Sequence, residues 1–293
     1  MRPEVSVIVV NFRGEECLGP CLESLKCQLF KKFETILVDN GSEPTFVAEI
    51  AARFPWAILL QNPTNVGFAG AVNQAIGTSR GEFIATLNHD TIAAQGWLEG
   101  LVDTIRRHPQ VGMCASQIRL HDRPDLLDSA GLAIHPDGLG KQRGRGEPAD
   151  HYMASEEVFC PSACAALYRR TMLEEIGLLD EEFFAYCEDT DLGFRGRVRE
   201  WGCAYVPQAV VHHRYSIVLG PYSLTKLYLV ERNRLWTVFK NFPRPYLAAS
   251  IPFTLVRYAA HALVTAAQLT VQVPAIVRWP GLPDQSVSHA SYR

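Results

Sequence analysis

The chain has 293 residues, of which 28 are basic and 31 acidic, giving a formal net charge of −3. An apolar content of 47% excludes a disordered chain, and the near-neutral charge excludes a dedicated nucleic-acid binder, which would carry a strong basic excess. The eight cysteines include no Cys-x-x-Cys pair, so we expect no structural zinc site and reduced thiols.

The first half of the chain alternates short apolar runs with helical patterns. These predict strands at 5–10, 35–38, 57–60 and 83–87, and helices at about 18–29, 67–76 and 96–107. Strands separated by helices predict βαβ units and a mostly parallel α/β sheet, whose sites form at the carboxyl ends of the strands. Asn11, Asp39 and Asp90 each follow a predicted strand, so we expect them at one edge of the sheet.

The second half is less regular. A basic, glycine-rich stretch at 135–146 predicts a mobile loop. A strand is predicted at 158–168, followed by helices at 171–176 and 189–201. The segment 204–213 predicts two strands joined by a proline-containing corner, and 223–240 predicts a helix. The first residues lack the apolar region and cleavage site of a signal peptide, which favours a cytoplasmic protein.

A polar triplet, Asn88-His89-Asp90, follows the strand predicted at 83–87. The side chains of Asn88 and Asp90 would point to the same side of an extended backbone, where their oxygens suit a divalent cation or a sugar hydroxyl. Asn and Asp are also ordinary turn residues, so the triplet by itself is better explained as a turn.

An acidic cluster stands at the start of the helix predicted at 189–201. Glu188, Asp189 and Asp191 lie within four residues, and like charges this close raise one another's pKa values, which suits a general base. The same residues could cap the helix, whose dipole favours negative charge at its N-terminus. The catalytic and the capping interpretations are compatible.

Two further segments bear on the site. His212 and His213 end an apolar strand, and adjacent side chains of a strand point to opposite faces, so at most one should face the site. Gly67 begins a helix whose N-terminus favours phosphate. The stretch around Gly67 is neither a GxGxxG motif nor a P-loop, which disfavours nicotinamide dehydrogenases and P-loop enzymes.

The order of these segments strongly resembles the nucleotide-sugar glycosyltransferases of family 2, and within them the rhamnosyltransferase-like branch. The segments at 127–131 and 176–180 and the pair Arg232-Asn233 are similar to that branch as well. The resemblance spans about residues 4–241. It implies a GT-A fold with a nucleotide-sugar half at about 1–117 and an acceptor half at about 118–241. The last fifty residues carry no specific match, and their low charge predicts an apolar helical extension at 242–293.

The resemblance also implies residue roles. The nucleotide-sugar would be bound by Val10, Asn11, Asp39, Asn65, Gly67, Asn73 and Asn88. Among these, Asp39 would contact the base, and Asn65, Gly67 and Asn73 would line the nucleotide pocket. Asn88 and Asp90 occupy the family's DxD-type position, where Asn88 replaces the first Asp.

The same resemblance implies a metal-dependent, inverting mechanism. Asp90 would bind a divalent cation, Mn²⁺ or Mg²⁺, and His212, or otherwise His213, would complete the metal shell. Asp189 would be the catalytic base, with Glu188 and Asp191 beside it in the acidic cluster.

These roles predict transfer of a sugar, such as rhamnose, from a nucleoside-diphosphate donor to a saccharide or lipid-linked acceptor, in surface polysaccharide or cell-wall assembly. One alternative is a non-catalytic nucleotide-sugar or glycan-binding module on a degenerate transferase fold. A second alternative, a nucleotidyltransferase, is disfavoured because its basic, glycine-rich phosphate loop is absent after Val10. The sequence predicts neither the acceptor nor the oligomeric state.

The final segment carries few charged residues. From residue 246 onward, the only charged residues are Arg257, Arg278, Asp284 and Arg293. A polar stripe recurs at helical spacing at His261, Thr265, Gln268 and Gln272. This pattern predicts an amphipathic helix that lies on the inner face of a membrane or on a partner, or that packs on the catalytic domain.

Overall fold

The computed structural model describes residues 2–214 and 223–272, and the side chains of residues 264–272 are not described. The first half contains β1 (Val5–Asn11), α1 (Glu15–Lys26), β2 (Phe33–Asn40), α2 (Pro44–Arg53), β3 (Ile58–Asn62), α3 (Gly67–Thr78), β4 (Phe83–Asn88), β5 (Thr91–Ala93) and α4 (Trp97–Arg107). The predicted strands and helices of this half are confirmed, and α2 is an additional helix.

The second half adds shorter strands and the last helices. It contains β6 (Val111–Leu120), β7 (Leu127–Ser129), β8 (Leu132–Ile134), β9 (Gly140–Gln142), η1 (Ala149–Tyr152), β10 (Glu156–Glu157), β11 (Ala165–Arg169), α5 (Arg170–Ile176), η2 (Glu181–Phe183), α6 (Glu188–Val198), β12 (Gly202–His213), α7 (Leu224–Asn241) and α8 (Arg244–Gln272).

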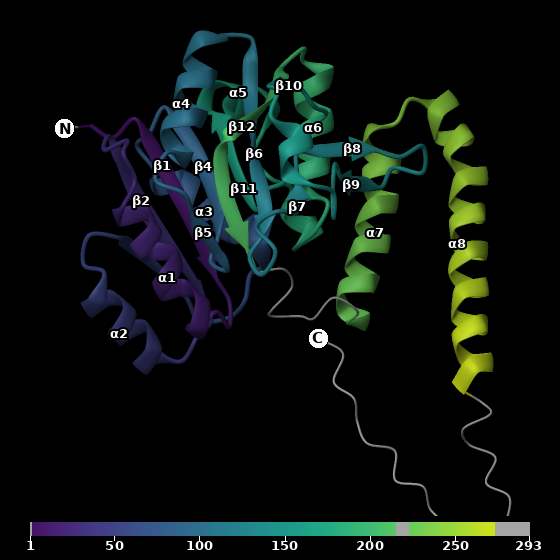
Figure 1. The fold of residues 1–293 in the computed structure, drawn as a ribbon, viewed down its shortest axis with the longest axis horizontal. Helices are drawn as coiled ribbons and strands as arrows, with labels where there is room; N and C mark the ends of the chain where they lie inside the picture. The colour runs from purple at the N-terminus through teal and green to yellow at the C-terminus, as the bar shows by residue number, and fades with distance from the viewer. Residues whose placement is uncertain (1, 215–222, 273–293) are drawn as a thin grey trace, which may run out of the picture.

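One large sheet runs through both halves, in the order β10-β12-β6-β11-β4-β1-β2-β3 (Figure 1). The pairs β4–β1, β1–β2 and β2–β3 are parallel, as the βαβ pattern predicts, and β6 pairs in parallel with β12. Strand β11 lies antiparallel between β4 and β6 and joins the two parallel blocks. The α/β fold class is therefore confirmed, with antiparallel pairs concentrated in the second half.

Strand β1 shows how the sheet divides the core. Its residues are all buried, and they alternate between two hydrophobic clusters on opposite faces. Val7 packs in the cluster that includes residues of α1 and α4, whereas Ile8 packs in the cluster that includes residues of α3. Burial of both faces fixes the register, so the polar side chains that follow the strands emerge at one edge.

Three predictions in the second half need correction. The glycine-rich stretch at 135–146 forms part of the β8–β9 hairpin instead of a mobile loop, and Gly140 packs closely on Thr190 of α6. The segment predicted as a strand from 158 is extended in the sheet only from Ala165, in β11. The predicted corner in 204–213 is a bulge within a single strand, β12, because Val206 and Val210 pair with consecutive residues of β6.

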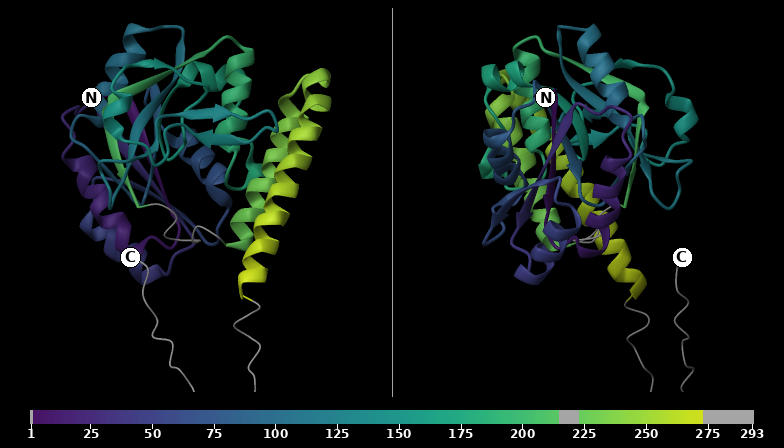
Figure 2. Two further views of the ribbon diagram at one scale, coloured as in Figure 1. Left: turned by 45° about the vertical axis from the view of Figure 1, so that its right-hand side comes forward. Right: turned by 90° about the vertical axis from the view of Figure 1, so that its left-hand side faces the viewer.

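Helix α8 runs antiparallel to α7 along one side of the molecule (Figures 1 and 2). Arg257 pairs with Asp137 in the β8–β9 turn at 2.6 Å and with Glu231 of α7 at 3.1 Å. Tyr258 accepts a hydrogen bond from Arg234 of α7. Buried and half-buried polar groups therefore attach α8 to the rest of the chain.

The outer side of α8 is apolar. Exposed side chains along it are Tyr246, Ile251, Phe253, Leu255, Val256 and Leu263. Within residues 2–214 and 223–272, no helix is long and apolar enough to cross a membrane. Of the predicted polar stripe, His261 is exposed, and the other three side chains lie outside the described part of the chain, as do residues 273–293.

Candidate functional site

The carboxyl ends of β1 and β2 meet as predicted. Asn11 and Asp39 are opposite each other in the parallel register, and the Asn11 amide donates to Asp39 at 3.0 Å and to Ser42 at 3.1 Å. The backbone N–H of Ser42 donates to the other Asp39 oxygen. Both residues are at least 98% buried, so this end of the sheet holds a fixed carboxylate and amide at the mouth of the parallel strands.

The loop before α3 is organised by asparagines. Asn40 donates to Asn65 at 2.8 Å and to the carbonyl oxygen of Gly67, and Asn65 accepts from the N–H of Gly67. These bonds hold Gly67 at a φ of 84°, a conformation that favours glycine. A Cβ at this position would lie 2.6 Å from the carbonyl oxygen of Phe184, so the close approach also requires glycine.

The N-terminus of α3 is already occupied by the protein. The carbonyl oxygen of Phe184 accepts from the N–H groups of Phe68 and Ala69 at 2.6 and 3.2 Å. The prediction that this helix end favours phosphate is therefore corrected, because its first donors are used to hold the 183–187 segment.

The side chain of Asn73 is engaged in contacts within the protein. Its side chain donates to the carbonyl oxygen of Leu179 at 2.8 Å and to Glu181 at 3.0 Å, and it accepts from the N–H of Leu179. These contacts join α3 to the segment before α6. The sequence predicts that Asn73 lines the nucleotide pocket, whereas in the structure its side chain holds two segments of the protein together.

The third strand end carries Asn88 and Asp90. Asn88 ends β4, its backbone N–H donates to the carbonyl oxygen of Cys164, and its side chain is partly exposed. Asp90 is 8% exposed, and its Oδ1 lies 3.3 Å from Nε2 of His213. Burial alone would raise the pKa of Asp90, but the hydrogen bond and positive charge of His213 outweigh it and lower that pKa.

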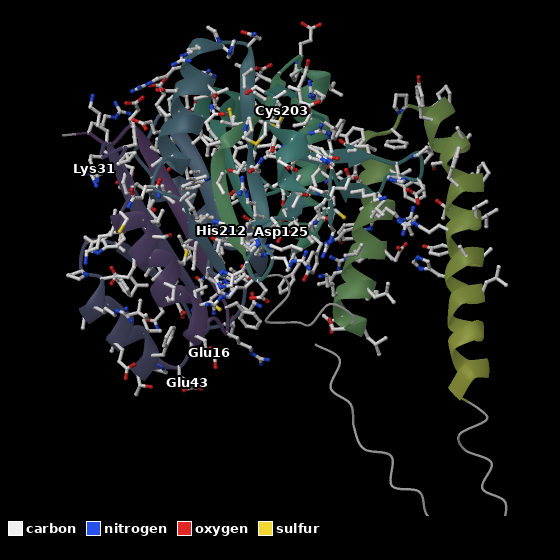
Figure 3. All side chains as sticks on the ribbon, viewed as in Figure 1. Glu16, Lys31, Glu43, Asp125, Cys203 and His212 are labelled. Carbon is white, nitrogen blue, oxygen red and sulfur yellow. The ribbon has the colours of Figure 1, made fainter. Side chains whose placement is uncertain are left out.

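The histidine beside Asp90 is His213, whereas the sequence favours His212. In β12, Val211 and His213 are buried and His212 is half-buried, and His213 pairs with Thr91 next to Asp90. Burial, together with Arg119 and His121, lowers the pKa of His212. Figure 3 labels His212 at the same end of the sheet as Asp125, whereas Cys203, near the start of β12, lies at the other end.

The sequence could not decide between the two histidines. Val210 and Val211 are both apolar, so the alternation that would reveal the buried face is lost just before them. The bulge between Val206 and Val210 then shifts the phase of the strand.

The acidic pair lies at the start of α6. Asp189 accepts from the N–H of Ala163 at 3.1 Å, and from the N–H and hydroxyl of Thr190 at 2.7 and 3.2 Å. Glu188 is 5% exposed, and its Oε2 has no hydrogen-bond partner among the described residues. Burial, and then the charge of Asp189, raise the pKa of Glu188 to about 8. Burial also raises the pKa of Asp189, against the three hydrogen bonds that it accepts.

Asp191, which the sequence groups with this pair, serves another purpose. It is completely buried, with one oxygen 2.9 Å from Nε of Arg195 and the other accepting from Asn241 of α7 at 2.8 Å. Asp191 therefore joins α6 to α7, and its prediction as a catalytic residue is corrected.

The segment before the pair is strained and clamped. Phe184, Tyr186 and Cys187 all have positive φ values, between 63° and 71°, which cost energy in residues other than glycine. The amide of Asn233, a buried residue of α7, donates to the carbonyl oxygens of Phe183, Ala185 and Tyr186 at 2.7–2.8 Å. The sequence marked Arg232-Asn233 only as a similarity and gave no sign of this clamp.

A short segment connects the acidic pair to the strand ends. The N–H of Ala163 donates to Asp189, and the carbonyl oxygen of the next residue, Cys164, accepts from the N–H of Asn88. The Cys164 thiol contacts His213, whose charge helps to offset the effect of burial on the pKa of Cys164. The predicted base and the predicted metal position are thus joined through two consecutive residues.

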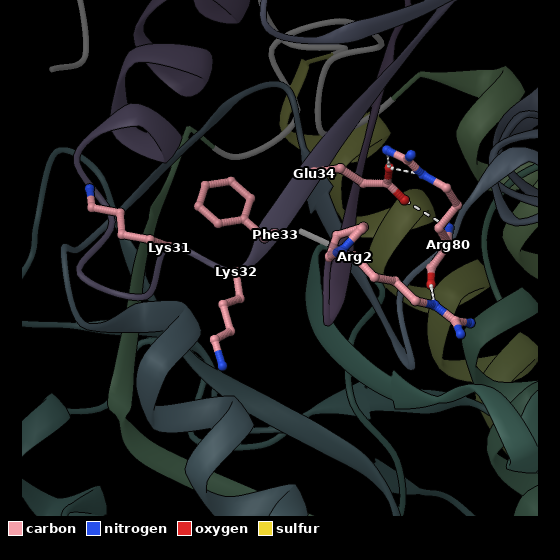
Figure 4. A pocket seen from close by; sticks show the side chains of 7 residues that line it. Arg2, Lys31, Lys32, Phe33, Glu34 and Arg80 are labelled. Atoms are coloured by element: carbon pink, nitrogen blue, oxygen red, sulfur yellow. Dashed lines mark hydrogen bonds and ion pairs between the residues drawn. The ribbon is translucent and has the colours of Figure 1, made fainter.

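A separate basic hollow lies at the amino ends of β1 and β2, with a volume of about 390 Å³. It is lined by Arg2, Pro3, Lys31, Lys32, Phe33, Glu34 and Arg80 (Figure 4). Arg80 donates three hydrogen bonds to Glu34, one from its backbone N–H and two from its guanidinium. Its place at the opposite end of the strands separates this hollow from the candidate site.

Comparison with known proteins identifies the class of this fold and site. Residues 6–177 match the profile of Glycosyl transferase family 2, and the chain belongs to that family. It is 26% identical over 272 residues to the N-acetylglucosaminyl-diphospho-decaprenol L-rhamnosyltransferase of Mycobacterium tuberculosis (strain CDC 1551 / Oshkosh), an alignment that covers 80% of this chain and 87% of the relative.

Solved structures agree on the fold. A mannosyltransferase from Pyrobaculum calidifontis, in complex with GDP-Man and Mn²⁺, aligns with a TM-score of 0.58 at 17% identity, over 94% of this chain and 82% of that chain. A GalNAc-T7 structure with UDP, GalNAc and Mn²⁺ aligns with a TM-score of 0.60 at 15% identity, over 72% of this chain, which spans 44% of that chain. The predicted GT-A fold is confirmed, and the chain is a glycosyltransferase.

Proposed function

We propose that the chain is an inverting, metal-dependent glycosyltransferase that uses a nucleoside-diphosphate sugar. The observation that carries this proposal is the Glu188–Asp189 pair, joined to Asn88 and His213 by the Ala163–Cys164 segment. Direct displacement of a diphosphate requires two parts, a base and a set of oxygen and nitrogen ligands. Here both parts contact the same short segment.

The donor would bind at the ends of β1 and β2. The fixed carboxylate of Asp39 suits the N–H groups of a nucleotide base, and Oδ1 of Asn11 is a buried acceptor without a partner among the described residues. Asn65 and Gly67 would flank this pocket. Asn73 is left out of it, because its amide is engaged by Leu179 and Glu181.

Asp90 and His213 fit a divalent cation. A carboxylate oxygen and an imidazole nitrogen lie 3.3 Å apart and are both nearly buried. Mn²⁺ accepts both kinds of donor, whereas Mg²⁺ would be held mainly by the oxygen. No cluster of three or more His, Cys, Asp or Glu ligands occurs in the part of the chain that the structure describes, so diphosphate oxygens and Asn88 would supply further ligands. A bound cation would neutralise the charge that develops on the leaving diphosphate.

Asp189 would act as the base. With its pKa near 8, Glu188 retains a proton at neutral pH, so the shared negative charge resides on Asp189. Asp189 would take the proton of the acceptor hydroxyl as its oxygen forms a bond to the anomeric carbon. The bond from that carbon to the diphosphate oxygen breaks with its electron pair going to the diphosphate, and attack from the opposite side inverts the anomeric centre.

We further propose rhamnose as the sugar and a lipid-linked saccharide as the acceptor, supported by the name of the mycobacterial relative.

We also propose that the chain contacts the cytoplasmic face of a membrane peripherally, supported by the exposed apolar side chains of α8. Fractionation of the full chain and of a chain ending at residue 241 would test that contact, which is refuted if both stay in the soluble fraction at low salt.

The decisive experiment is a product assay with dTDP-rhamnose, UDP-hexoses and a lipid-linked N-acetylglucosamine acceptor, with Mn²⁺ or with EDTA. We expect a product with the anomeric configuration opposite to that of the donor, and no product with EDTA. Retention of configuration would overturn the inverting mechanism. Metal-dependent donor binding without any product from the acceptors would instead favour a binding module.

A further inference from the structure

A third carboxylate stands behind the predicted metal position. Asp128, in β7, is 2% exposed, and its Oδ2 lies 2.7 Å from Nδ1 of His213. Its other oxygen lies 3.6 Å from Nη1 of Arg145. The groups therefore form a line from Asp90 through His213 to Asp128 and Arg145, built from the turn between β4 and β5, strands β12 and β7, and the turn after β9.

The contacts of His213 use both ring nitrogens in different ways. Nδ1 is held by Asp128, which can only accept a hydrogen bond when it is ionised, so this nitrogen carries a proton. Nε2 is the nitrogen that faces Asp90. A cation between Asp90 and His213 needs an unprotonated Nε2 lone pair, and the proton on Nδ1 is the arrangement that provides it.

The backbone around Asp128 holds this carboxylate in place. Leu127 is buried, its N–H donates to the carbonyl oxygen of Glu147, and its carbonyl oxygen accepts from Gly146. Ser129 pairs with Ile118 of β6 and donates its hydroxyl to Gly131. Asp128 is thus fixed from both sides in the chain, which is what a residue that orients another side chain requires.

We propose that Asp128 is a positioning residue for the metal site, which fixes the ring orientation and tautomer of His213 and thereby strengthens divalent cation binding. The inference rests on the proposed metal-dependent function, since it concerns the same cation. Arg145 supports the carboxylate from the side away from His213. Outer carboxylates of this kind typically change metal affinity 10–100-fold when they are removed.

The test measures Mn²⁺ affinity directly, by calorimetry and by the EPR signal of free Mn²⁺, with UDP or dTDP present. We expect Asp128→Asn to weaken Mn²⁺ binding about 10-fold and Asp128→Ala up to about 100-fold, since Asn keeps an acceptor for Nδ1 but loses the charge. Asp125→Asn is the matched control, because Asp125 is an exposed carboxylate two residues before β7 that pairs with Arg123.

Nucleotide binding in EDTA and thermal unfolding separate positioning from folding. Both are expected to stay near wild type in Asp128→Asn. Unchanged Mn²⁺ affinity in Asp128→Asn, with a wild-type chain that binds Mn²⁺, would overturn the positioning role and leave the proposed function standing. A wild-type chain that does not bind Mn²⁺ with either nucleotide would overturn the proposed metal dependence, and with it this inference.

Discussion

Asp90 and the Glu188–Asp189 pair are carboxylates largely shielded from solvent, and yet their pKa values shift in opposite directions. The pKa of Asp90 is lowered, whereas the pKa values of Glu188 and Asp189 are raised. Burial raises the pKa in both places, so it cannot account for the difference. What differs is the neighbour. With no cation bound, the hydrogen bond and charge of His213 lower the pKa of Asp90, whereas the acidic pair has no ion-pair partner among the described residues.

The contrast separates two chemical tasks. A carboxylate whose pKa is lowered stays ionised and is suited to hold a cation, whereas a pair whose pKa values are raised holds one proton and can take another near neutral pH. Under the proposed function, carboxylates would therefore serve two purposes at the two ends of the Ala163–Cys164 segment. Each of the following variants is expected to affect either the proposed base or the proposed metal site and to leave the other unchanged.

The largest effect is expected from Asp189→Asn. Removal of the base should lower kcat by about 10²–10⁴-fold, since general-base catalysis typically contributes that much. Donor and Mn²⁺ affinities should remain within about twofold of wild type, because Asp189 binds neither. The measurement is steady-state kinetics together with calorimetry of the nucleotide. Full turnover by Asp189→Asn with a competent acceptor would show that another group is the base.

Asp90→Asn should weaken the proposed metal site. It replaces the carboxylate by a neutral amide of the same shape, so Mn²⁺-dependent binding of a nucleoside diphosphate should fall at least tenfold, and binding in EDTA should be unchanged. Calorimetry with and without Mn²⁺ measures both. An unaltered Mn²⁺-dependent affinity would remove Asp90 from the metal site and would leave the role of Asp189 untouched.

Asn233→Ala tests whether the strained segment positions the acidic pair. The variant loses three hydrogen bonds to the carbonyl oxygens of Phe183, Ala185 and Tyr186, at a cost of about 1–3 kcal/mol in unfolding free energy. We expect kcat to fall about tenfold and donor affinity to be retained. Arg232→Ala, which removes neighbouring contacts to Glu182 and Phe183, is the control and should have a smaller effect. Equal kcat values for wild type and Asn233→Ala would refute the clamp.

The sequence predicted the strand-end residues more successfully than the contacts made by the second half. Asn11 and Asp39 follow continuous β-branched runs, and parallel topology places such residues at one edge without further information. Asp191, by contrast, is the same residue type as Asp189 and lies in the same first turn of α6, and only its contacts with Arg195 and with Asn241 of α7 separate the two. Such long-range packing leaves no periodic signal in the sequence.

Strand β6 illustrates the same limit within the fold. It is a central strand that pairs with β11, β12 and β7, but its sequence, VGMCASQIRL, has few β-branched residues and no alternation. Because both faces of the strand are buried, its sequence shows no alternation of polar and apolar residues, and the strand was not predicted. The proposed role of Asp128 was not predicted either, because it depends on a histidine 85 residues further along the chain, and the segment 127–131 was marked only as a similarity.

Glu188→Gln is expected to act mainly on stability. The pKa of Glu188 is about 8 in the folded chain against an ordinary value of 4.5, so between these values the folded state holds a proton that the unfolded state has lost. Its contribution is therefore complete below about pH 4.5 and is lost as the pH rises through 8, at up to about 1.4 kcal/mol per pH unit. Denaturant unfolding of Glu188→Gln from pH 5 to 9 should show a flatter profile. Gln imitates the protonated acid, so activity at pH 7 should change little; a loss as large as in Asp189→Asn would make Glu188 the base.

The smallest effect on donor recognition is expected from Asn73→Ala. Its amide joins α3 to Leu179 and Glu181, so the variant should lose about 1–3 kcal/mol of stability while donor affinity stays within twofold. Asp39→Ala is the matched comparison, because Asp39 lies at the sheet edge and should lose nucleotide binding by an order of magnitude. Thermal unfolding and calorimetry of both variants measure the two effects separately. If Asn73→Ala weakened donor binding as strongly as Asp39→Ala, the donor pocket would extend along α3, and the Asn73 contacts to Leu179 and Glu181 would have to open when the nucleotide binds.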